Sequence, residues 1–118
     1  MKKHKLIIAV DFDGTIVDHM FPIIGPERLN AFYFLRKLKE EGHKLILWTC
    51  REGVYLQHAI DYCEHNGVTF DAVNDNVKGI NFETSRKIYY DLLVDDRNLK
   101  WYNDSWESIY NEIQKVIR

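Results

Sequence analysis

The chain has few of the residues and patterns that mark several large classes of proteins. Its 118 residues include 2 cysteines, 2 prolines and 6 glycines, and no repeat, low-complexity tract or Pro/Gly/Ser-rich linker divides it. Cys50 and Cys63 have neither CxxC spacing nor the number that a disulfide framework needs. We therefore expect free thiols in a reducing cytoplasm, and no metal–thiolate site. The length and the lack of a linker predict one domain, residues 1–118, long enough to bury about two thirds of its unfolded surface.

The chain also lacks a long hydrophobic run and a strong excess of one charge. The apolar residues before Asp11 are too few for a signal peptide and far too few for a membrane span. A content of 46% hydrophobic and 29% charged residues is typical of a soluble globular protein. The net charge of −2 gives no general basic field for nucleic acid. We therefore expect a cytoplasmic protein with no membrane partner.

The most informative stretch is LIIAVDFDGTIVD, which begins at Leu6. Its five apolar residues, Leu6 to Val10, are rich in β-branched side chains and predict a strand buried on both faces. The strand ends in Asp11 and Asp13, and Gly14 and Thr15 follow. Ligands of parallel α/β sheets bind at the carboxyl ends of the strands. Two carboxylates at such an end therefore predict a site for a divalent cation.

The rest of the chain alternates between helical and extended patterns. We expect a flap over 19–25, helices over 26–41 and 51–66 with glycine stops, strands over 44–49, 68–73 and 90–94, a polar loop over 74–81 followed by a short helical stretch, and a last helix from Asn103 or Asp104 to Arg118. This βαβαβ(α)β order predicts an α/β fold. The expected architecture is a three-layer α/β/α, Rossmann-like, mostly parallel sheet with right-handed crossovers. Four strand ends would then share one edge of the sheet.

The order of these strand ends resembles a known family. A DFDGT element, a strand ending in Thr49, a lysine and a strand ending in Asp95 and Asp96 are similar to the haloacid dehalogenase (HAD) superfamily. Its members are chiefly Mg²⁺-dependent phosphatases, and the resemblance spans most of the chain. It implies Mg²⁺ as the cofactor and hydrolysis of a phosphomonoester through an aspartyl phosphate.

The resemblance also implies roles for individual residues. Asp11 would be the nucleophile and Asp13 the general acid and base, while Thr49 would bind the phosphoryl group and Lys87 would offset its charge. The metal would be held by four aspartates, Asp11, Asp13 through its backbone carbonyl, Asp95 and Asp96. The substrate would be contacted by residues beside these strand ends, which are Gly14, Thr15, Cys50, Arg51 and Asn74.

Two assignments have competing candidates. Lys78 also precedes the last strand, and we favour Lys87 because it is closer to that strand. Neighbouring residues of a strand point in opposite directions, so we expect Asp96 to bind the metal directly and Asp95 to act from further out.

Two other classes of protein share this inventory. A two-component receiver domain also has paired acids, a Thr or Ser and a lysine at one sheet edge, but its phosphoacceptor aspartate ends a middle strand. In this chain the middle strand ends in Thr49, so the order favours the hydrolase. The remaining alternatives are a phosphotransferase and a regulatory protein that binds phosphate without catalysis.

The substrate follows less directly from the sequence. The intervals before and after Thr49 are filled by the expected flap, helices and strand, so no cap domain fits between them. An open site suits a macromolecular phosphate end, or a phosphorylated small molecule enclosed by a neighbouring subunit of a homo-oligomer.

Overall fold

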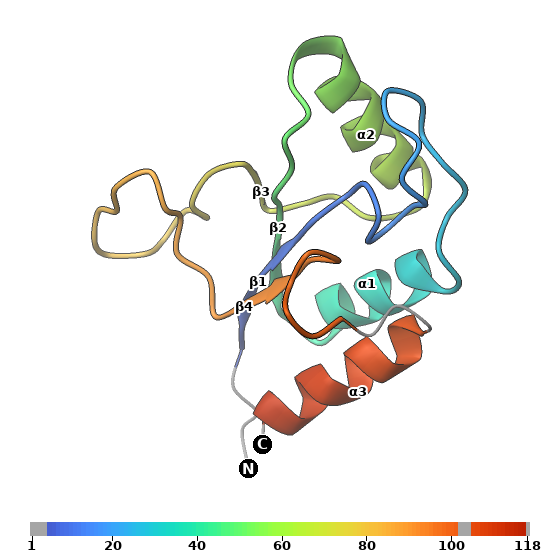
Figure 1. The fold of residues 1–118 in the computed structure, drawn as a ribbon. Coiled ribbons are helices and arrows are strands. Elements are labelled where there is room, and N and C mark those ends of the chain that lie inside the picture. Colours follow the sequence, from blue (N-terminus) through green and yellow to red (C-terminus); the bar gives the residue numbers. More distant parts are fainter. Residues whose placement is uncertain (1–4, 102–104, 118) are drawn as a thin grey trace.

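Four short strands form one parallel sheet in this computed structural model, which describes residues 5–101 and 105–117. In space the strands follow the order β3-β2-β1-β4, and all three pairings are parallel. Their carboxyl ends therefore share one edge of the sheet, as the sequence predicts (Figure 1). The strands are β1 (Ile7–Val10), β2 (Lys44–Leu47), β3 (Ala72–Val73) and β4 (Leu92–Val94).

One face of the sheet packs against the helices. These are α1 (Ala31–Glu40), α2 (Gly53–His65) and α3 (Trp106–Ile117). Alternate residues of β1, Ile8 and Val10, belong to a buried cluster that also contains Leu35, Ala59 and Ile109 from the three helices. Because side chains of a strand alternate between faces, this face of the sheet forms the larger part of the core.

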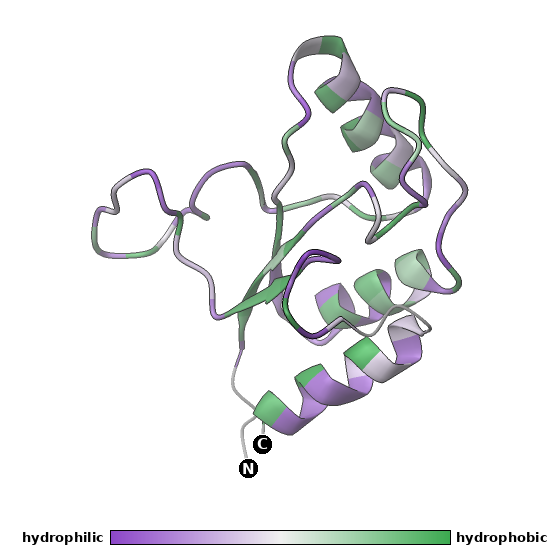
Figure 2. Cartoon of the chain, viewed as in Figure 1, coloured by the Kyte–Doolittle hydropathy of each residue, from purple (hydrophilic) through white to green (hydrophobic). Residues whose placement is uncertain are grey.

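The opposite face is covered by residues 74–91, which follow β3. Ala9 and Ile46 point to this side and pack with Val77 and Ile88 of that segment. In Figure 1 the segment lies across the sheet from α1 and α3, and Figure 2 shows that it is largely hydrophilic. The fold is thus an α/β Rossmann-like fold, and no cap domain interrupts the described part of the chain.

The short helical stretch predicted before Lys87 is wrong, because no helix forms in the described residues between α2 and β4. The segment is instead organised by the side chain of Asn76, whose amide donates a hydrogen bond to Thr84 Oγ1 (2.8 Å). The side-chain oxygen of Asn76, Oδ1, accepts a hydrogen bond from the backbone N–H of Tyr89 (2.7 Å). Side chain-to-backbone bonds of this kind compete with helix formation.

Helix α1 begins five positions later than the predicted start at Pro26. The chain at Pro26 and Glu27 pairs with the turn after β1 instead, through a Val17–Glu27 bridge and a 2.9 Å bond from Asp18 N–H to the Pro26 carbonyl. The Glu27 carboxylate then accepts a hydrogen bond from Phe32 N–H in the first turn of the helix (3.0 Å). Pro26 and Glu27, which the sequence pattern assigned to the helix, therefore lie outside it.

The other predicted elements are present with shifted ends. Strands β3 and β4 are shorter than the predicted 68–73 and 90–94, and β2 ends before Thr49. Gly42 and Gly67, the predicted helix stops, have positive φ angles of 93° and 84°. The predicted N-cap candidates of the last helix, Asn103 and Asp104, lie outside the described residues.

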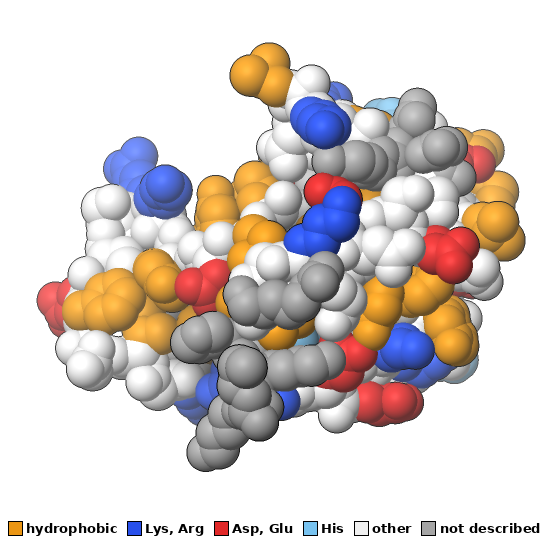
Figure 3. All heavy atoms as spheres, turned by 90° about the horizontal axis from the view of Figure 1, so that it is seen from below, with side chains coloured by type: hydrophobic (Ala, Val, Ile, Leu, Met, Phe, Trp, Pro, Cys, Tyr) orange, Lys and Arg blue, Asp and Glu red, His pale blue; other side chains and the backbone are white. Residues whose placement is uncertain are grey.

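The surface carries no dominant charge on the face drawn in Figure 3. Acidic and basic side chains are interspersed there with hydrophobic ones. Within the described ranges, no helix combines the length and hydrophobicity needed to cross a membrane.

Candidate active site

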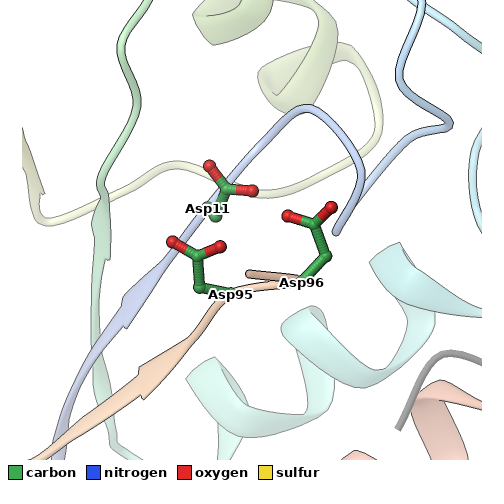
Figure 4. A group of neighbouring side chains, drawn as sticks. All are labelled: Asp11, Asp95 and Asp96. Atoms are coloured by element: carbon green, nitrogen blue, oxygen red, sulfur yellow. The ribbon is translucent and has the colours of Figure 1, made fainter. Parts of the chain in front are cut away.

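Three aspartates meet at the carboxyl ends of two adjacent strands. Asp11 follows β1, and Asp95 and Asp96 follow β4, which pairs with β1. One carboxylate oxygen from each lies within 4.8 Å of the others. In Figure 4 the three carboxylates extend above the strand ends toward a common space. Asp11 and Asp96 are therefore close enough to hold one cation, as the resemblance required.

The expectation that Asp95 and Asp96 face opposite ways is wrong. Strand β4 ends at Val94, so both acids lie in the turn beyond it, where Asn98 N–H donates to the Asp95 carbonyl (3.2 Å). Strand alternation no longer applies there, and both carboxylates approach Asp11. Asp95 lines the adjoining pocket, whereas Asp96 packs behind it against Gly14.

Thr15 connects the acids of the two strands. Its buried hydroxyl donates a 2.9 Å hydrogen bond to Asp11 Oδ2 and accepts a 3.0 Å bond from the backbone N–H of Asp96. Its carbonyl accepts a 2.9 Å bond from the indole N–H of Trp106 in α3. Thr15 does not line the pocket, so it orders the carboxylates and not the substrate.

Gly14 allows Asp96 to come this close. Its φ of +88° is in the left-handed region, and a Cβ at this position would lie 2.3 Å from Asp96 Oδ2. Only glycine avoids both the backbone strain and the clash. The glycine of the DFDGT element is thus explained by the position of the last-strand acid.

The convergence of the acids changes the ionisation of Asp11. The pKa of Asp11 is raised from 3.8 to about 7, chiefly by burial, and also by the negative charge of Asp95 and by the hydrogen bond and charge of Asp96. The hydrogen bond from Thr15 opposes this shift. A cation between the acids would reverse the repulsion, because it favours the charged form of each carboxylate.

Asp13 lies in a different environment. Both of its carboxylate oxygens accept hydrogen bonds from Arg51, from Nε at 2.8 Å and from Nη2 at 2.8 Å. Arg51 is 3% exposed, and its guanidinium lies 5.1 Å from the ring centroids of Phe12 and Phe21. Arg51 is therefore an interior residue with a fixed partner, whereas the sequence suggested a residue that contacts the substrate.

A pocket of about 410 Å³ adjoins the acids. It is lined by two of the three clustered aspartates, by the loop after β2, by two residues of the flap over 19–25 and by one arginine that follows Asp96. Its lining residues are Asp11, Asp13, His19, Phe21, Thr49, Cys50, Arg51, Asp95 and Arg97.

The loop after β2 is held in place by two side chains. Thr49 N–H donates to Asn74 Oδ1 (2.8 Å), and Thr49 Oγ1 accepts a bond from Arg51 N–H (3.1 Å). Asn74 does not line the pocket, so its contact is with the loop. The exposed Cys50 lines the pocket beside Thr49. Cys63 is buried, which raises the pKa of its thiol to about 12 and leaves it unreactive.

The lysine predicted for the site lies elsewhere. The Lys87 ammonium is 6.0 Å from the Tyr90 ring centroid, and the residue lines a different hollow in the segment after β3. Lys78 is also not among the residues that line the acid pocket. Arg97 lines it, and the sequence reasoning missed this residue. Its position directly after Asp96, at the shared sheet edge, was the available signal.

The chain was compared with protein families, curated proteins and solved structures. No family model and no curated protein matches it. A solved structure, that of a conserved protein from Bacteroides thetaiotaomicron, is 42% identical in sequence with a TM-score of 0.88. The match covers 96% of this chain and 93% of the other. The chain therefore belongs to the same family as this conserved Bacteroides thetaiotaomicron protein.

Proposed function

We propose that the protein is a Mg²⁺-dependent phosphomonoester hydrolase that acts through an aspartyl phosphate on Asp11, as the resemblance to the HAD superfamily implies. The observation that carries the proposal is the meeting of Asp11, Asp95 and Asp96 within 4.8 Å at the edge of a pocket that also contains Thr49. The sequence separates these residues widely, and the fold gives them one common space.

The donor set fits magnesium. Mg²⁺ prefers oxygen ligands and retains several waters, so two or three carboxylates at an open edge satisfy it. The raised pKa of Asp11 also reflects uncompensated negative charge at this point. When bound, Mg²⁺ would neutralise the carboxylates and polarise a phosphoryl oxygen.

Asp11 is the proposed nucleophile because it lies in the pocket and has a fixed orientation. The Thr15 hydroxyl donates a hydrogen bond to Oδ2 of Asp11. The second carboxylate oxygen, Oδ1, does not take part in this bond and is available to react. A carboxylate oxygen of Asp11 would form a bond to phosphorus while the bond from phosphorus to the leaving oxygen breaks. Water would then attack the phosphorus of the aspartyl phosphate, releasing inorganic phosphate and restoring Asp11.

Asp13 is the proposed proton donor to the leaving oxygen and the proton acceptor from the attacking water. It lines the pocket two residues after Asp11. Because both of its oxygens bond to Arg51, Asp13 has to exchange one of these bonds for a bond to the leaving group or the water.

The phosphoryl oxygens would be bound by Thr49 and Arg97. Thr49 Oγ1 can still donate its proton, because its hydrogen bond with Arg51 N–H uses it as an acceptor. Arg97 is exposed and lines the pocket, so it replaces Lys87 in our proposal as the cation that faces the substrate. A guanidinium is suited to bind phosphate oxygens in pairs.

The substrate we propose is a phosphorylated small molecule or the phosphate end of a macromolecule. A volume of about 410 Å³ accommodates a phosphate and part of its leaving group. Closure by a neighbouring subunit and a cytoplasmic location remain part of the proposal.

Hydrolysis is tested by incubating the protein with p-nitrophenyl phosphate and a panel of sugar, nucleotide and oligonucleotide phosphates, with and without Mg²⁺. We expect multiple turnovers that EDTA abolishes. A receiver would take up phosphate from acetyl phosphate without multiple turnover, and a phosphotransferase would release more leaving group than inorganic phosphate. A protein that only binds phosphate would neither turn over these substrates nor accept phosphate from acetyl phosphate, and that result would contradict the proposal.

A further inference from the structure

The side chain of Arg51 connects Asp13, the flap over 19–25 and helix α2. Its guanidinium makes five hydrogen bonds, two to the Asp13 carboxylate and three to backbone carbonyls. Those carbonyls belong to Pro22 (3.2 Å), Ile23 (3.1 Å) and Tyr55 (3.2 Å). A guanidinium has five N–H donors, so none of them is left for a substrate.

The flap over 19–25 is anchored elsewhere mainly at its ends. Asp18 N–H bonds to the Pro26 carbonyl (2.9 Å), which brings the two ends of the flap together. Between them Met20, Phe21 and Ile23 are 46%, 49% and 60% exposed, whereas Ile24 packs against the main core. The bonds from Arg51 to Pro22 and Ile23 therefore hold its middle. Phe21 adds an edge-to-face contact with Tyr55 at 5.6 Å.

The held flap forms one wall of the pocket. His19 and Phe21 line it, together with Thr49 and Cys50 of the loop after β2. Arg51 bonds at the same time to Asp13, the residue proposed to exchange protons with the leaving group. The flap wall and the proton-exchanging carboxylate are thus fixed to one buried side chain.

We propose that Arg51 is a positioning residue that holds Asp13 and the flap as one unit, so that the flap closes over the leaving group while Asp13 faces its oxygen. This inference rests on the proposed function for its catalytic half. Arg51 does not touch substrate, and it acts through Asp13 and the carbonyls of Pro22 and Ile23.

Lysine cannot reproduce this arrangement, since its ammonium is a compact charge with three donors and cannot bind a carboxylate as a planar fork. In Arg51→Lys we expect amide hydrogen exchange at 19–25 to be at least about tenfold faster than in the wild type. Exchange in α1 should be unchanged. The matched control is Arg36→Lys, which alters another arginine bonded to a backbone carbonyl, that of Asn66.

The catalytic half is tested with two substrates that differ in the basicity of the leaving group. Misplacement of a catalytic group by about 1 Å can cost about 100-fold. We expect Arg51→Lys to lower kcat for phenyl phosphate by about this factor, because its basic leaving oxygen needs the proton of Asp13. The loss for p-nitrophenyl phosphate should be at least tenfold smaller.

Unchanged flap exchange in Arg51→Lys, or equal losses of kcat for the two esters, would overturn the inference. An inactive wild type would reject the proposed function, and flap exchange would still decide whether Arg51 holds the flap. If Arg51→Lys does not fold, Asp13→Asn tests the same unit, because loss of the charged partner should also increase exchange at 19–25.

Discussion

Asp11 and Asp13 are two residues apart, and their carboxylates have opposite electrostatic surroundings. Asp13 has its charge balanced within the protein by the buried guanidinium of Arg51. Asp11 instead faces Asp95 and Asp96, and the Thr15 hydroxyl supplies a hydrogen bond but no positive charge.

This contrast shows why one pocket can use two carboxylates in different ways. Asp13 has a fixed guanidinium as its partner, whereas the neighbours of Asp11 are two further acids and a hydroxyl. On the Asp13 side the protein contains its own cation, which fixes the geometry. On the Asp11 side, the described groups that shift its pKa supply no positive charge. In our proposal a bound Mg²⁺ balances these carboxylates, so metal binding there should depend on pH.

The largest expected effect comes from Asp11→Asn. This change keeps the size of the side chain and an acceptor for Thr15 but removes the anionic nucleophile. Turnover of p-nitrophenyl phosphate with Mg²⁺ should fall by at least about 10⁴-fold. The control Asp75→Asn alters an exposed acid outside the pocket and should keep wild-type turnover. Persistent activity of Asp11→Asn would show that another residue is the nucleophile.

The pH dependence of stability tests whether the acid cluster lacks a balancing charge. The folded protein raises the pKa of Asp11 from 3.8 to about 7, so the stability that this group contributes is present below pH 3.8 and is lost as pH rises through 7. Without metal, Asp11→Asn should therefore unfold about 5–10 °C higher than the wild type at pH 8.

At pH 4 the two proteins should unfold at similar temperatures, and Mg²⁺ should reduce the difference at pH 8 by stabilising the wild type. Thermal unfolding followed by circular dichroism measures both effects. A wild type that is the more stable of the two at pH 8 without metal would contradict the electrostatic interpretation.

Gly14→Ala tests how tightly Asp96 is held in the cluster. A methyl group would meet Asp96 Oδ2 at 2.3 Å and would occupy a backbone with φ of +88°. We expect a loss of about 1–3 kcal/mol in the free energy of unfolding, from strain at this backbone conformation, and a further loss of Mg²⁺ affinity. Chemical denaturation and calorimetric titration measure the two quantities.

Gly79→Ala is the matched control for that variant. Gly79 has a similar positive φ of 96°, but a Cβ there would meet nothing within 4 Å. It should show the backbone cost without the loss of Mg²⁺ affinity. Equal Mg²⁺ affinity in the two variants would show that the approach of Asp96 to Gly14 is unimportant for the metal.

The smallest expected effect separates Arg97 from Lys87. Arg97→Ala should raise KM for p-nitrophenyl phosphate about tenfold, because the pocket loses a guanidinium that can bond to phosphate. Lys87→Ala should change KM less than twofold, since Lys87 lies over Tyr90 and outside this pocket. Steady-state kinetics of the two variants measure both KM values. A larger increase in KM for Lys87→Ala than for Arg97→Ala would show that Lys87 is the cation that binds the substrate.

The acid cluster could be predicted because it depends on strong local patterns. LIIAV predicts a buried strand, YDLLV predicts a second strand, and parallel strands place their carboxyl ends at one edge. The approach of Asp11 to Asp95 and Asp96 follows from that topology. Even so, the expectation that Asp95 and Asp96 face opposite ways failed, because the strand ends at Val94 and the turn beyond it has no alternation. The choice of Asp96 as the direct metal ligand stays a prediction.

The cations of the pocket could not be predicted in the same way. Arg51 follows Thr49 by two residues and looks like an exposed charge in the sequence, yet its acceptors come from three separate places, at Asp13, Pro22–Ile23 and Tyr55. Lys87 was chosen from the family resemblance and its closeness to the last strand, and the helical stretch expected before it is replaced by the contacts of Asn76. Contacts made through backbone carbonyls leave no trace in a sequence pattern.

The bond from Trp106 to the carbonyl of Thr15 joins residues that are 91 positions apart in the sequence. During synthesis from the N-terminus, the DFDGT turn is among the first parts made, but it lacks this partner until α3 has emerged and docked. The early segment that carries the proposed nucleophile is therefore completed by one of the last segments to be synthesised. A nascent chain ending after Asp96 would contain all three aspartates of the cluster without the indole that steadies the turn between them.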